Sequence, residues 1–415
     1  MTQAAPELRG GNPLGSENSE EGAARKLLTI GVLKETEPGE QRVAIVPESL
    51  RALAAAGVRV LVESGAGAAA FFPDSAYEHS GSPVVSADEA LARADALVSI
   101  GAPGPVLISR MHAGQAVIGM LAPLVQPGLA RQLADQGLTA ISLDCLPRTV
   151  SRAQAMDALT SQANIAGYKA VLVAADHFGR IFPMLITAAG TAKPASVLVL
   201  GAGVAGLQAM GTARRLGAMV TGYDVRPETR DQVESVGARF LELESVGPAG
   251  GQGGYARALT SAEQVAQQED LGRHIARFDI VITTAQVPGR RPPLLVTAAA
   301  VAGMQPGAVV VDLAASSLGG NVDGSQPGQV ILTDGGARII GAGNLAAQVP
   351  TAASTAYSHN IAALLADIVR DGALDINPSD EIQAGVVITY QGKVIHPAVG
   401  ALLDDSHVPG TGDCR

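Results

Sequence analysis

Short apolar runs alternate with amphipathic stretches through the first third of the chain. The segment 27–35 (LLTIGVLKE) predicts a strand, and Val58–Ser64 predicts a second one. Between them, Pro47–Ala56 predicts a helix that begins with proline and stops at Gly57. The alternation continues to about residue 150. Because strands buried on both faces of a parallel sheet are almost wholly apolar, the pattern predicts a parallel α/β domain.

A second series of such units begins near residue 197. An apolar strand, Val197–Leu200, leads into an alanine-rich helical pattern that closes at Gly217, and the next apolar run, Met219–Tyr223, ends in Asp224. Three glycines separate the first strand from the helix in the spacing G-x-G-x-x-G: Gly201, Gly203 and Gly206. The order strand, glycine turn, helix, strand and terminal acid predicts a dinucleotide-binding unit.

Each element of this fingerprint has a physical role. The first glycine permits the tight turn, the second leaves room for a pyrophosphate, and the third lets helix and strand pack closely. The helix N-terminus, at Val204 and Ala205, offers N–H groups to the phosphates. A glycine-rich turn in a nucleotide-free α/β domain is the alternative, but it does not explain Asp224.

The acid and its neighbours bear on cofactor choice. Asp224 would accept hydrogen bonds from the adenosine ribose, and its charge repels a 2′-phosphate, which favours NAD(H) over NADP(H). Val225 and Arg226 follow it, and an arginine there argues the other way, because it can hold a 2′-phosphate. We give Asp224 priority because it stands at the strand tip.

The rest of this region completes a Rossmann pattern. A third strand is predicted at Ala238–Leu243, and a helix at Leu259–Ala276. Residues 248–255 form a glycine-rich loop ending in Tyr255, either a surface loop or a lid over a cofactor. Two later strands end in residues placed to meet a ribose and its surroundings: Thr284 and Ala285 after the first, Asp312 and Leu313 after the second. Two short strands, Val330–Thr333 and Arg338–Gly341, predict a hairpin arm.

A long helical pattern, Arg148–Arg180, interrupted by Gly167, leads from the first domain to the second. Its opening allows two interpretations. In the first, Ser151 caps the helix and Gln154 closes a capping box. In the second, Arg148, Gln154 and Asp157 face an interdomain cleft that receives the nicotinamide end of a dinucleotide.

These patterns together predict an α/β protein with two Rossmann-like, doubly wound parallel-sheet domains, joined by long helices across a cleft. Residues 1–26 are expected to be a disordered extension, and 399–415 a loop-like tail. Residues 27–150 and 350–398 are expected to form the first, discontinuous domain. Residues 151–180 connect it to the nucleotide-binding domain, 181–349.

Composition narrows the function. The 415 residues carry a net charge of −10 without a basic stripe, which argues against nucleic acid as a partner. The two cysteines, Cys145 and Cys414, provide neither a disulfide framework nor a metal cage, so no metal site is predicted. Every apolar run is broken well before about 18 residues, so no membrane insertion is expected. The low number of cysteines fits a reducing cytoplasm.

Several motifs occur in a familiar order: GVLKETEPGEQRVAIVP, RAQAMDALTSQANIAGYKAV, ITAAGTAKPASVLVLGAGVAGLQA, DVRPE, GGYA, TTAQVPGRRPP and VVVDLA. Over residues 27–398 the chain resembles the soluble NAD(H)-binding component of proton-translocating nicotinamide nucleotide transhydrogenase. The resemblance implies hydride transfer from NADH to NADP⁺ on a different subunit, coupled to proton movement through membrane-spanning subunits. It also implies a homodimer, with the hairpin near 330–340 as a candidate arm, and a cytoplasmic protein attached peripherally to the membrane through its partners.

The same resemblance assigns site residues. Arg148, Gln154, Asp157 and Thr160 match the family's cleft loop around the nicotinamide, and Tyr255 matches the tyrosine of its mobile loop. Between Pro147 and Ser151 this chain has one residue more than the commoner family form. Whether Arg148 or Arg152 takes the nicotinamide-side position therefore stays open.

The fold is shared with alanine dehydrogenase, which is the alternative function. Arg42 matches an arginine of that enzyme, but its lysine, histidine and aspartate are not found in the matching segments 99–102, 120–123 and 316–318. The resemblance therefore argues against amino-acid dehydrogenation. A catalytically silent NAD(H)-binding module is the third possibility.

Overall fold

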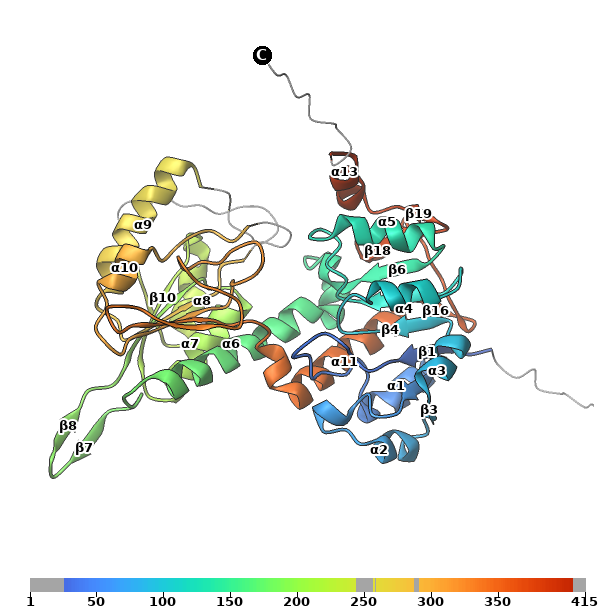
Figure 1. The fold of residues 1–415 in the computed structure, drawn as a ribbon, viewed down its shortest axis with the longest axis horizontal. Helices are drawn as coiled ribbons and strands as arrows, with labels where there is room; N and C mark the ends of the chain where they lie inside the picture. Colours follow the sequence, from blue (N-terminus) through green and yellow to red (C-terminus); the bar gives the residue numbers. More distant parts are fainter. Residues whose placement is uncertain (1–25, 244–256, 258, 287–290, 406–415) are drawn as a thin grey trace, which may run out of the picture.

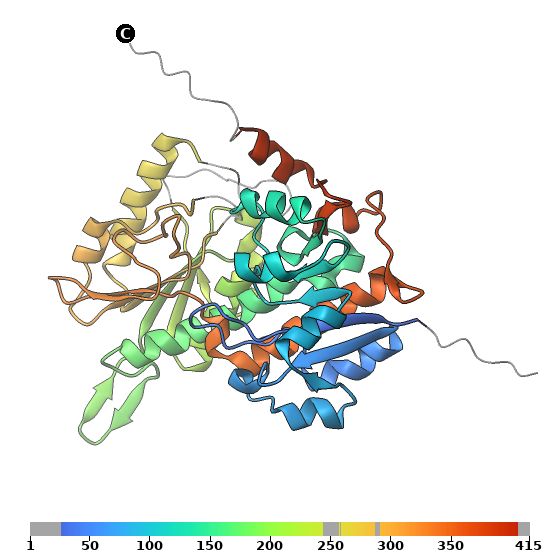
Figure 2. The same ribbon diagram turned by 45° about the vertical axis from the view of Figure 1, so that its right-hand side comes forward.

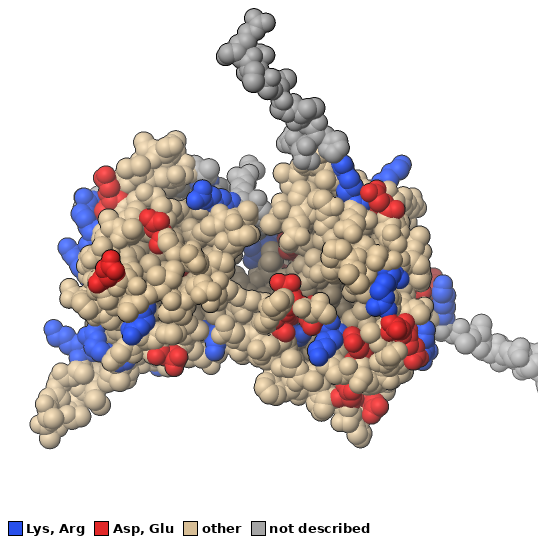
Figure 3. Space-filling model, in the orientation of Figure 1, with Lys and Arg blue, Asp and Glu red and all other residues tan. Residues whose placement is uncertain are grey.

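Two lobes linked by long helices make up the molecule (Figure 1). The computed structural model describes residues 26–243, 257, 259–286 and 291–405. Each lobe is built on a mostly parallel sheet, as expected, and the space-filling view shows a hollow between the lobes (Figure 3). The predicted extension at residues 1–26 lies, except for its last residue, outside the described residues.

An eight-stranded sheet forms the first lobe, in the order β19-β18-β6-β5-β4-β1-β2-β3. Its first six strands along the chain pair in parallel, and its other two come from the C-terminal region and add antiparallel pairs at one edge. The strands are β1 (Leu28–Val32), β2 (Val58–Glu63), β3 (Val84–Val85), β4 (Ala96–Val98), β5 (Ala116–Gly119), β6 (Thr139–Ser142), β18 (Val387–Tyr390) and β19 (Lys393–Val394). The strand order reverses between β1 and β4, which is where open α/β sheets present their crevice.

Short helices cover this sheet: α1 (Leu50–Ala55), α2 (Asp74–His79), α3 (Ala87–Arg93), α4 (Pro105–Arg110), α5 (Pro127–Asp135), α12 (Gln383–Val386) and α13 (Pro397–Asp405). The last of them corrects the expected loop-like tail. Pro397 occupies the first position of α13, where the missing N–H costs nothing, and Val399 and Leu403 are buried in the lobe's core. Residues 383–386 form the short helix α12 directly before β18.

Two long helices, α6 (Ala158–His177) and α11 (Pro350–Ile368), connect the lobes and pack against each other. Helix α11 is fixed to the first lobe because the hydroxyls of Ser354 and Ser358 accept hydrogen bonds from the N–H groups of Val43 and Val46, at 3.0 and 3.1 Å. Helix α6 continues through Gly167 without a break, which corrects the predicted interruption. The glycine serves close packing instead: a Cβ there would lie 2.1 Å from the carbonyl oxygen of Ala205 in the next helix.

The second lobe holds a seven-stranded sheet in the order β11-β10-β9-β12-β13-β15-β14, parallel except for β14. Its strands are β9 (Ser196–Leu200), β10 (Met219–Tyr223), β11 (Arg239–Phe240), β12 (Ile280–Thr283), β13 (Val309–Asp312), β14 (Val330–Leu332) and β15 (Arg338–Gly341). Its helices are α7 (Val204–Arg215), α8 (Arg230–Ser235), α9 (Ser261–Ile275) and α10 (Ala298–Ala302). The predicted strands and helices of this region are thus confirmed, with β11 shorter than expected.

Two hairpins differ in their placement. Strands β14 and β15 form the predicted hairpin, but β15 also pairs with β13, so this hairpin is the edge of the sheet. A second hairpin, β7 (Leu185–Thr187) and β8 (Gly190–Ala192), was not predicted and projects from the lobe (Figures 1 and 2). A small third pair joins β16 (Val369–Arg370) to β17 (Ala373–Leu374).

Candidate functional site

The glycine fingerprint forms a tight turn between β9 and α7. Gly201 has φ +106°, a conformation that glycine adopts without strain, and its N–H donates to the carbonyl of Tyr223 at 2.8 Å. A Cβ on Gly206 would lie 1.8 Å from the carbonyl oxygen of Gly201, whereas one on Gly203 would meet nothing within 4 Å. The first glycine therefore permits the turn, the third serves close packing, and the second keeps an open surface in front of the helix.

Helix α7 begins directly behind that open surface. Gly203 is its N-cap residue, and Val204 and Ala205 are its first two helical residues. The N–H groups of a first helical turn have no intrahelical partner and carry the positive end of the helix dipole. The turn is therefore suited to a phosphate group.

Asp224 stands at the tip of β10, beside this turn. Its Oδ2 accepts the N–H of Ala202 at 2.8 Å, which fixes the carboxylate against the glycine loop. Arg226 binds the same carboxylate, with Nε 2.9 Å from Oδ1. Val225, between them, is partly buried against the core of the lobe.

The ends of β12 and β13 form the neighbouring wall. The hydroxyl of Thr284 donates to the carbonyl of Gly201 at 3.2 Å, which joins this wall to the fingerprint turn. The carboxylate of Asp312 is fully buried; it accepts the Thr283 hydroxyl at 2.9 Å and the N–H of Ala314 at 3.0 Å. Asp312 thus anchors the wall from inside, and Leu313, which follows it, packs partly buried against the core.

Asn321 is a site residue that the sequence analysis missed. It is fully buried, and its side chain binds both ends of the Ala285 residue: Oδ1 accepts the N–H at 3.1 Å, and Nδ2 donates to the carbonyl at 2.9 Å. Nδ2 also donates to the carbonyl of Pro293 at 2.7 Å. A polar residue in a loop rich in small residues gives no periodic signal. Only the pair of glycines before it, at 319 and 320, marked the position.

A second polar cluster lies at the start of α6. Arg148 donates through Nε to Oδ2 of Asp157 at 2.9 Å and through Nη2 to the hydroxyl of Thr160 at 2.6 Å. Asp157 is the N-cap of α6 and accepts the N–H of Thr160 at 2.8 Å. Three of the predicted nicotinamide-side residues are therefore held together, with the arginine oriented by a carboxylate and a hydroxyl. Tyr255, the fifth predicted residue, lies outside the described residues.

The capping interpretation of Gln154 is wrong. Residues Ser151–Met156 form a 3₁₀ helix whose N-cap is Val150, without a side-chain cap hydrogen bond. Gln154 is exposed, and no hydrogen bond from its side chain is seen among the described residues. Its amide is thus available to a ligand.

Arg152 is engaged elsewhere. It bridges Asp367 of α11 and Asp380, at 3.0 and 2.5 Å, on the first lobe. This arrangement favours Arg148 over Arg152 for the nicotinamide-side position.

Helix α6 links the two groups of predicted residues. Thr160 lies in its first turn, and Gly167 contacts the first turn of α7. Seven residues of α helix span about 10 Å. The Arg148 cluster and the fingerprint turn are therefore within the reach of one extended dinucleotide.

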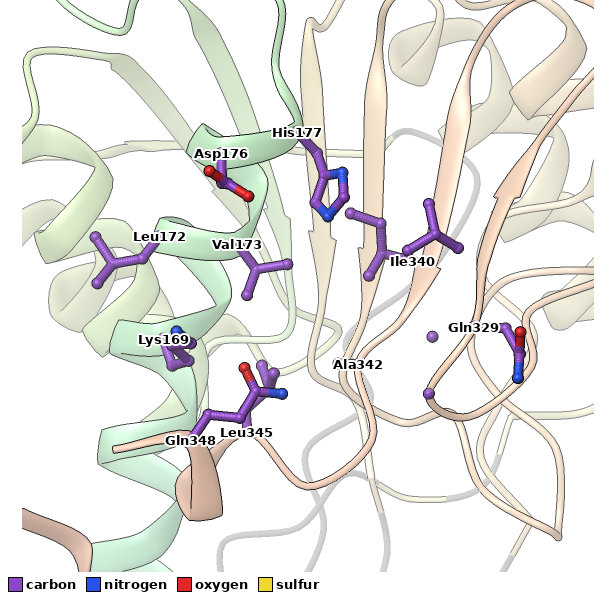
Figure 4. Close-up of a pocket in the computed structure, with 13 residues that line it drawn as sticks. Lys169, Leu172, Val173, Asp176, His177, Gln329, Ile340, Ala342, Leu345 and Gln348 are labelled. Carbon is purple, nitrogen blue, oxygen red and sulfur yellow. The ribbon is translucent and has the colours of Figure 1, made fainter. Parts of the chain in front are cut away.

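A cavity of about 550 Å³ lies apart from these residues (Figure 4). It is formed by the C-terminal half of α6, with Lys169, Asp176 and His177, by residues 328–330 at the start of β14, and by the segment from β15 to Gln348. None of the predicted cofactor-binding or nicotinamide-side residues lines it, whereas Val330, Ile340 and Gly341 of the predicted hairpin do. Within the described ranges, no group of three or more metal-binding side chains is found, and no helix is long and apolar enough to cross a membrane.

The fold and the fingerprint define a two-lobed α/β protein of the dinucleotide-binding type. Family models match most of the chain: the N-terminal domain of the alanine dehydrogenase/PNT family at residues 31–166 and its C-terminal domain at 170–397. The chain therefore belongs to the alanine dehydrogenase/PNT family.

Relatives named as transhydrogenase subunits are more similar than alanine dehydrogenases. The NAD(P) transhydrogenase subunit alpha of Cereibacter sphaeroides is 42% identical over 89% of this chain and 71% of its own length. The NAD(P) transhydrogenase subunit alpha of Haemophilus influenzae is 38% identical over 89% of this chain and 72% of its own length. The transhydrogenase structure from Sinorhizobium meliloti aligns with a TM-score of 0.80 at 41% identity, over 88% of this chain and 100% of that one. An L-alanine dehydrogenase structure gives 0.77 at 28%, over 91% and 99%. The resemblance found in the sequence is thus confirmed, and the relatives support an oxidoreductase role.

Proposed function

We propose that this chain is the NAD(H)-binding subunit of a proton-translocating transhydrogenase. NADH bound here transfers its C4 hydride, with both electrons of the broken C–H bond, to C4 of NADP⁺ on a partner subunit, leaving NAD⁺ and NADPH. Proton movement takes place in membrane-spanning partner subunits, to which this chain attaches from the cytoplasmic side. The observation that carries the proposal is the fingerprint turn with Asp224 beside it, in a chain 42% and 38% identical to two proteins named NAD(P) transhydrogenase subunit alpha.

Direct hydride transfer requires positioning, not proton exchange. The two rings must be held in contact with water excluded, and no general acid or base takes part. The segments that match the lysine, histidine and aspartate of alanine dehydrogenase offer none: Ser99, for example, donates its hydroxyl to the carbonyl of Gly101 at 2.6 Å. This argues against the alanine dehydrogenase alternative.

Each predicted site residue has a role in this proposal. The turn at Gly201, Gly203 and Gly206 receives the pyrophosphate on the first turn of α7, and Asp224 binds the adenosine ribose. Arg148, oriented by Asp157 and Thr160, faces the nicotinamide ribose or carboxamide. Gln154 binds the carboxamide with its exposed amide. The backbone at Ala285, held by Asn321, lines the ribose.

The function is tested by cofactor binding and transfer with the isolated chain. We expect NADH to bind and NADPH to bind much more weakly, with hydride transfer only after a transhydrogenase NADP(H)-binding domain is added. NADH oxidation with pyruvate and ammonia alone would instead establish an alanine dehydrogenase. Binding without transfer in any pairing would indicate a silent module.

Gln154→Ala is expected to slow hydride transfer by roughly 10–100-fold, because a misplaced ring loses near-attack geometry. NADH affinity and thermal stability should stay nearly unchanged, since the side chain caps no helix. Single-turnover transfer, NADH titration and thermal melts measure the three quantities. Ser151→Ala, in the same 3₁₀ helix, is the matched control and should change none of them. If Gln154→Ala lowered the melting temperature markedly as well as the rate of transfer, the assignment of Gln154 to the carboxamide would be contradicted.

The homodimer belongs to the proposal as well. The unpredicted hairpin β7–β8 projects from the second lobe and, with the residue before it, exposes Met184, Leu185 and Ile186, of which Ile186 is 72% exposed. Burial of these side chains against a second copy would remove a projecting apolar surface from water. The predicted arm at β14–β15 also exposes apolar groups, Leu332 among them.

Ile186→Asp is expected to shift the protein from dimer to monomer in sedimentation or light-scattering measurements. Leu332→Asp tests the sheet-edge hairpin in the same way. Val106→Asp is the control, because Val106 is an equally exposed apolar residue on the first lobe. A dimer that survives both hairpin substitutions would place the contact elsewhere.

A further inference from the structure

The carboxylate of Asp224 is already surrounded by donors from its own chain. Its Oδ1 accepts the backbone N–H of Arg226 at 3.0 Å and Nε at 2.9 Å. Its Oδ2 accepts the N–H of Ala202 at 2.8 Å and Nη2 of Arg226 at 2.9 Å. An ionised carboxylate offers about four acceptor positions, so three of them are taken by one arginine.

This pair is not a solvated surface contact. The Asp224 side chain is 8% exposed and that of Arg226 is 17% exposed. The fork of the guanidinium lies along both oxygens, in the bidentate arrangement that makes such pairs strong and directional. The Arg226 backbone is fixed separately, because its carbonyl accepts the N–H and the hydroxyl of Thr229, at 3.2 and 2.7 Å.

Arg226 thus covers the acid to which the proposed ligand must bind. Ribose hydroxyls reach the Asp224 carboxylate by replacing donors already bound to it, and two of the four belong to the guanidinium. A guanidinium at this point of a dinucleotide fold is also the group that receives the 2′-phosphate of NADP(H). The chain therefore combines, two residues apart, the acid of an NAD site and the arginine of an NADP site.

We propose that Asp224 selects against NADP(H) in two ways, by repelling the 2′-phosphate and by holding Arg226, a ready 2′-phosphate ligand, in an ion pair. The site then prefers NAD(H) because its cation, Arg226, is held by Asp224, and not because a cation for the 2′-phosphate is missing. The inference rests on the proposed function, since it concerns the adenosine end of the same NAD(H) site.

The two contributions of Asp224 are separated by a double-mutant cycle. Dissociation constants for NADH and NADPH are measured by fluorescence titration with the full chain, for wild type, Asp224→Asn, Arg226→Gln and the double variant. Asparagine keeps an oxygen for the N–H of Ala202 but cannot hold the guanidinium as an ion pair. Thermal melts show whether each variant is folded, and Asp224→Ser replaces Asp224→Asn if the latter is not.

We expect Asp224→Asn to weaken NADH binding and to strengthen NADPH binding by about 10–100-fold, the value of a charge-assisted hydrogen bond. In the double variant most of the NADPH gain should disappear. Glu228, exposed and close in sequence, is the acid that would recapture the released guanidinium, so adding Glu228→Gln to Asp224→Asn should raise NADPH affinity further.

Three other results would overturn either the inference or the proposed function. An equal NADPH gain with and without Arg226 would show that charge repulsion alone sets the preference, and would overturn the inference while leaving the NAD(H) site intact. No NADPH gain in Asp224→Asn would overturn it too. A wild-type chain that binds neither cofactor would overturn the proposed function, and the inference with it.

Discussion

Loss of NADH binding by more than about a hundredfold, together with a lower melting temperature, is the expected result of Gly206→Ala. The added Cβ would lie 1.8 Å from the carbonyl oxygen of Gly201 and 3.1 Å from the Thr284 hydroxyl. Both contacts are to groups that shape the phosphate turn, so the helix must move away from β9. Such overpacking costs about 1–3 kcal/mol or more and displaces the N–H groups that face the pyrophosphate.

Alanine substitutions at two other glycines of the same region should affect NADH binding and stability separately. Gly203→Ala meets nothing within 4 Å, so the melting temperature should stay unchanged while the new methyl group blocks the pyrophosphate and weakens NADH binding. Gly211, in the middle of α7, has only Arg215 at 3.8 Å, and alanine there should add up to about 1 kcal/mol of stability without affecting NADH. Thermal melts and NADH titration measure both effects. Normal NADH affinity in the Gly203 variant would mean that the pyrophosphate does not lie on this turn.

The sequence predicted the structure best where several independent signals indicated the same unit. The fingerprint turn, α7 and β10 were predicted to within a few residues, because apolar runs, fixed glycine spacing and a terminal acid all point to the same unit. The buried strands β1, β2, β12 and β13 were predicted for the same reason. Buried parallel strands have an apolar signal that solvent-exposed elements lack.

The misses have physical causes. The hairpin at 185–192 consists of three-residue strands with every side chain exposed, so neither burial nor alternation marks it. Ser151 and Gln154 have the spacing of a capping box. The N-cap of α6 is instead Asp157, six residues after Ser151, whose carboxylate accepts the N–H of Thr160. Helix α13 was missed where a loop-like tail was expected, although its first residue is Pro397 and proline suits a helix start.

The partners of charged groups could not be read from the sequence at all. Arg148 and Arg152 are four residues apart and chemically identical, yet one binds Asp157 of α6 and the other binds Asp367 of α11. The latter contact joins segments 215 residues apart. Only the packing of α11 against the opening of α6 decides between them. The partners of the uncharged Asn321 side chain could not be predicted either, because they lie in a separate loop, at Ala285 and Pro293.

The stability of the first lobe is expected to fall as the pH rises from about 4.5 to 7, and Glu35 is the cause. This residue follows β1 at the point where the strand order reverses, and its Oε1 accepts the N–H of Ile100 at 2.6 Å. Burial raises the pKa of Glu35 from 4.5 to about 7; the nearby Glu40 adds to the rise, while Ile100 and Arg42 oppose it. Between these two values the folded chain holds a proton that the unfolded chain has lost. By linkage, stability therefore decreases through this window and stays lower above it.

Glu35→Gln should remove this dependence, because glutamine stays neutral and still accepts the N–H of Ile100. We expect the variant to match wild type at pH 5 and to exceed it at pH 8 by about 1–3 kcal/mol, since one pKa unit corresponds to about 1.4 kcal/mol. Thermal melts from pH 4 to 9 measure the difference between the two profiles. Glu37→Gln, at an exposed position two residues away, is the control and should follow wild type. Asp144, whose pKa burial also raises, contributes equally to both chains and cancels in the comparison. Parallel profiles for wild type and Glu35→Gln would show that Glu35 is already ionised in the folded protein at pH 5.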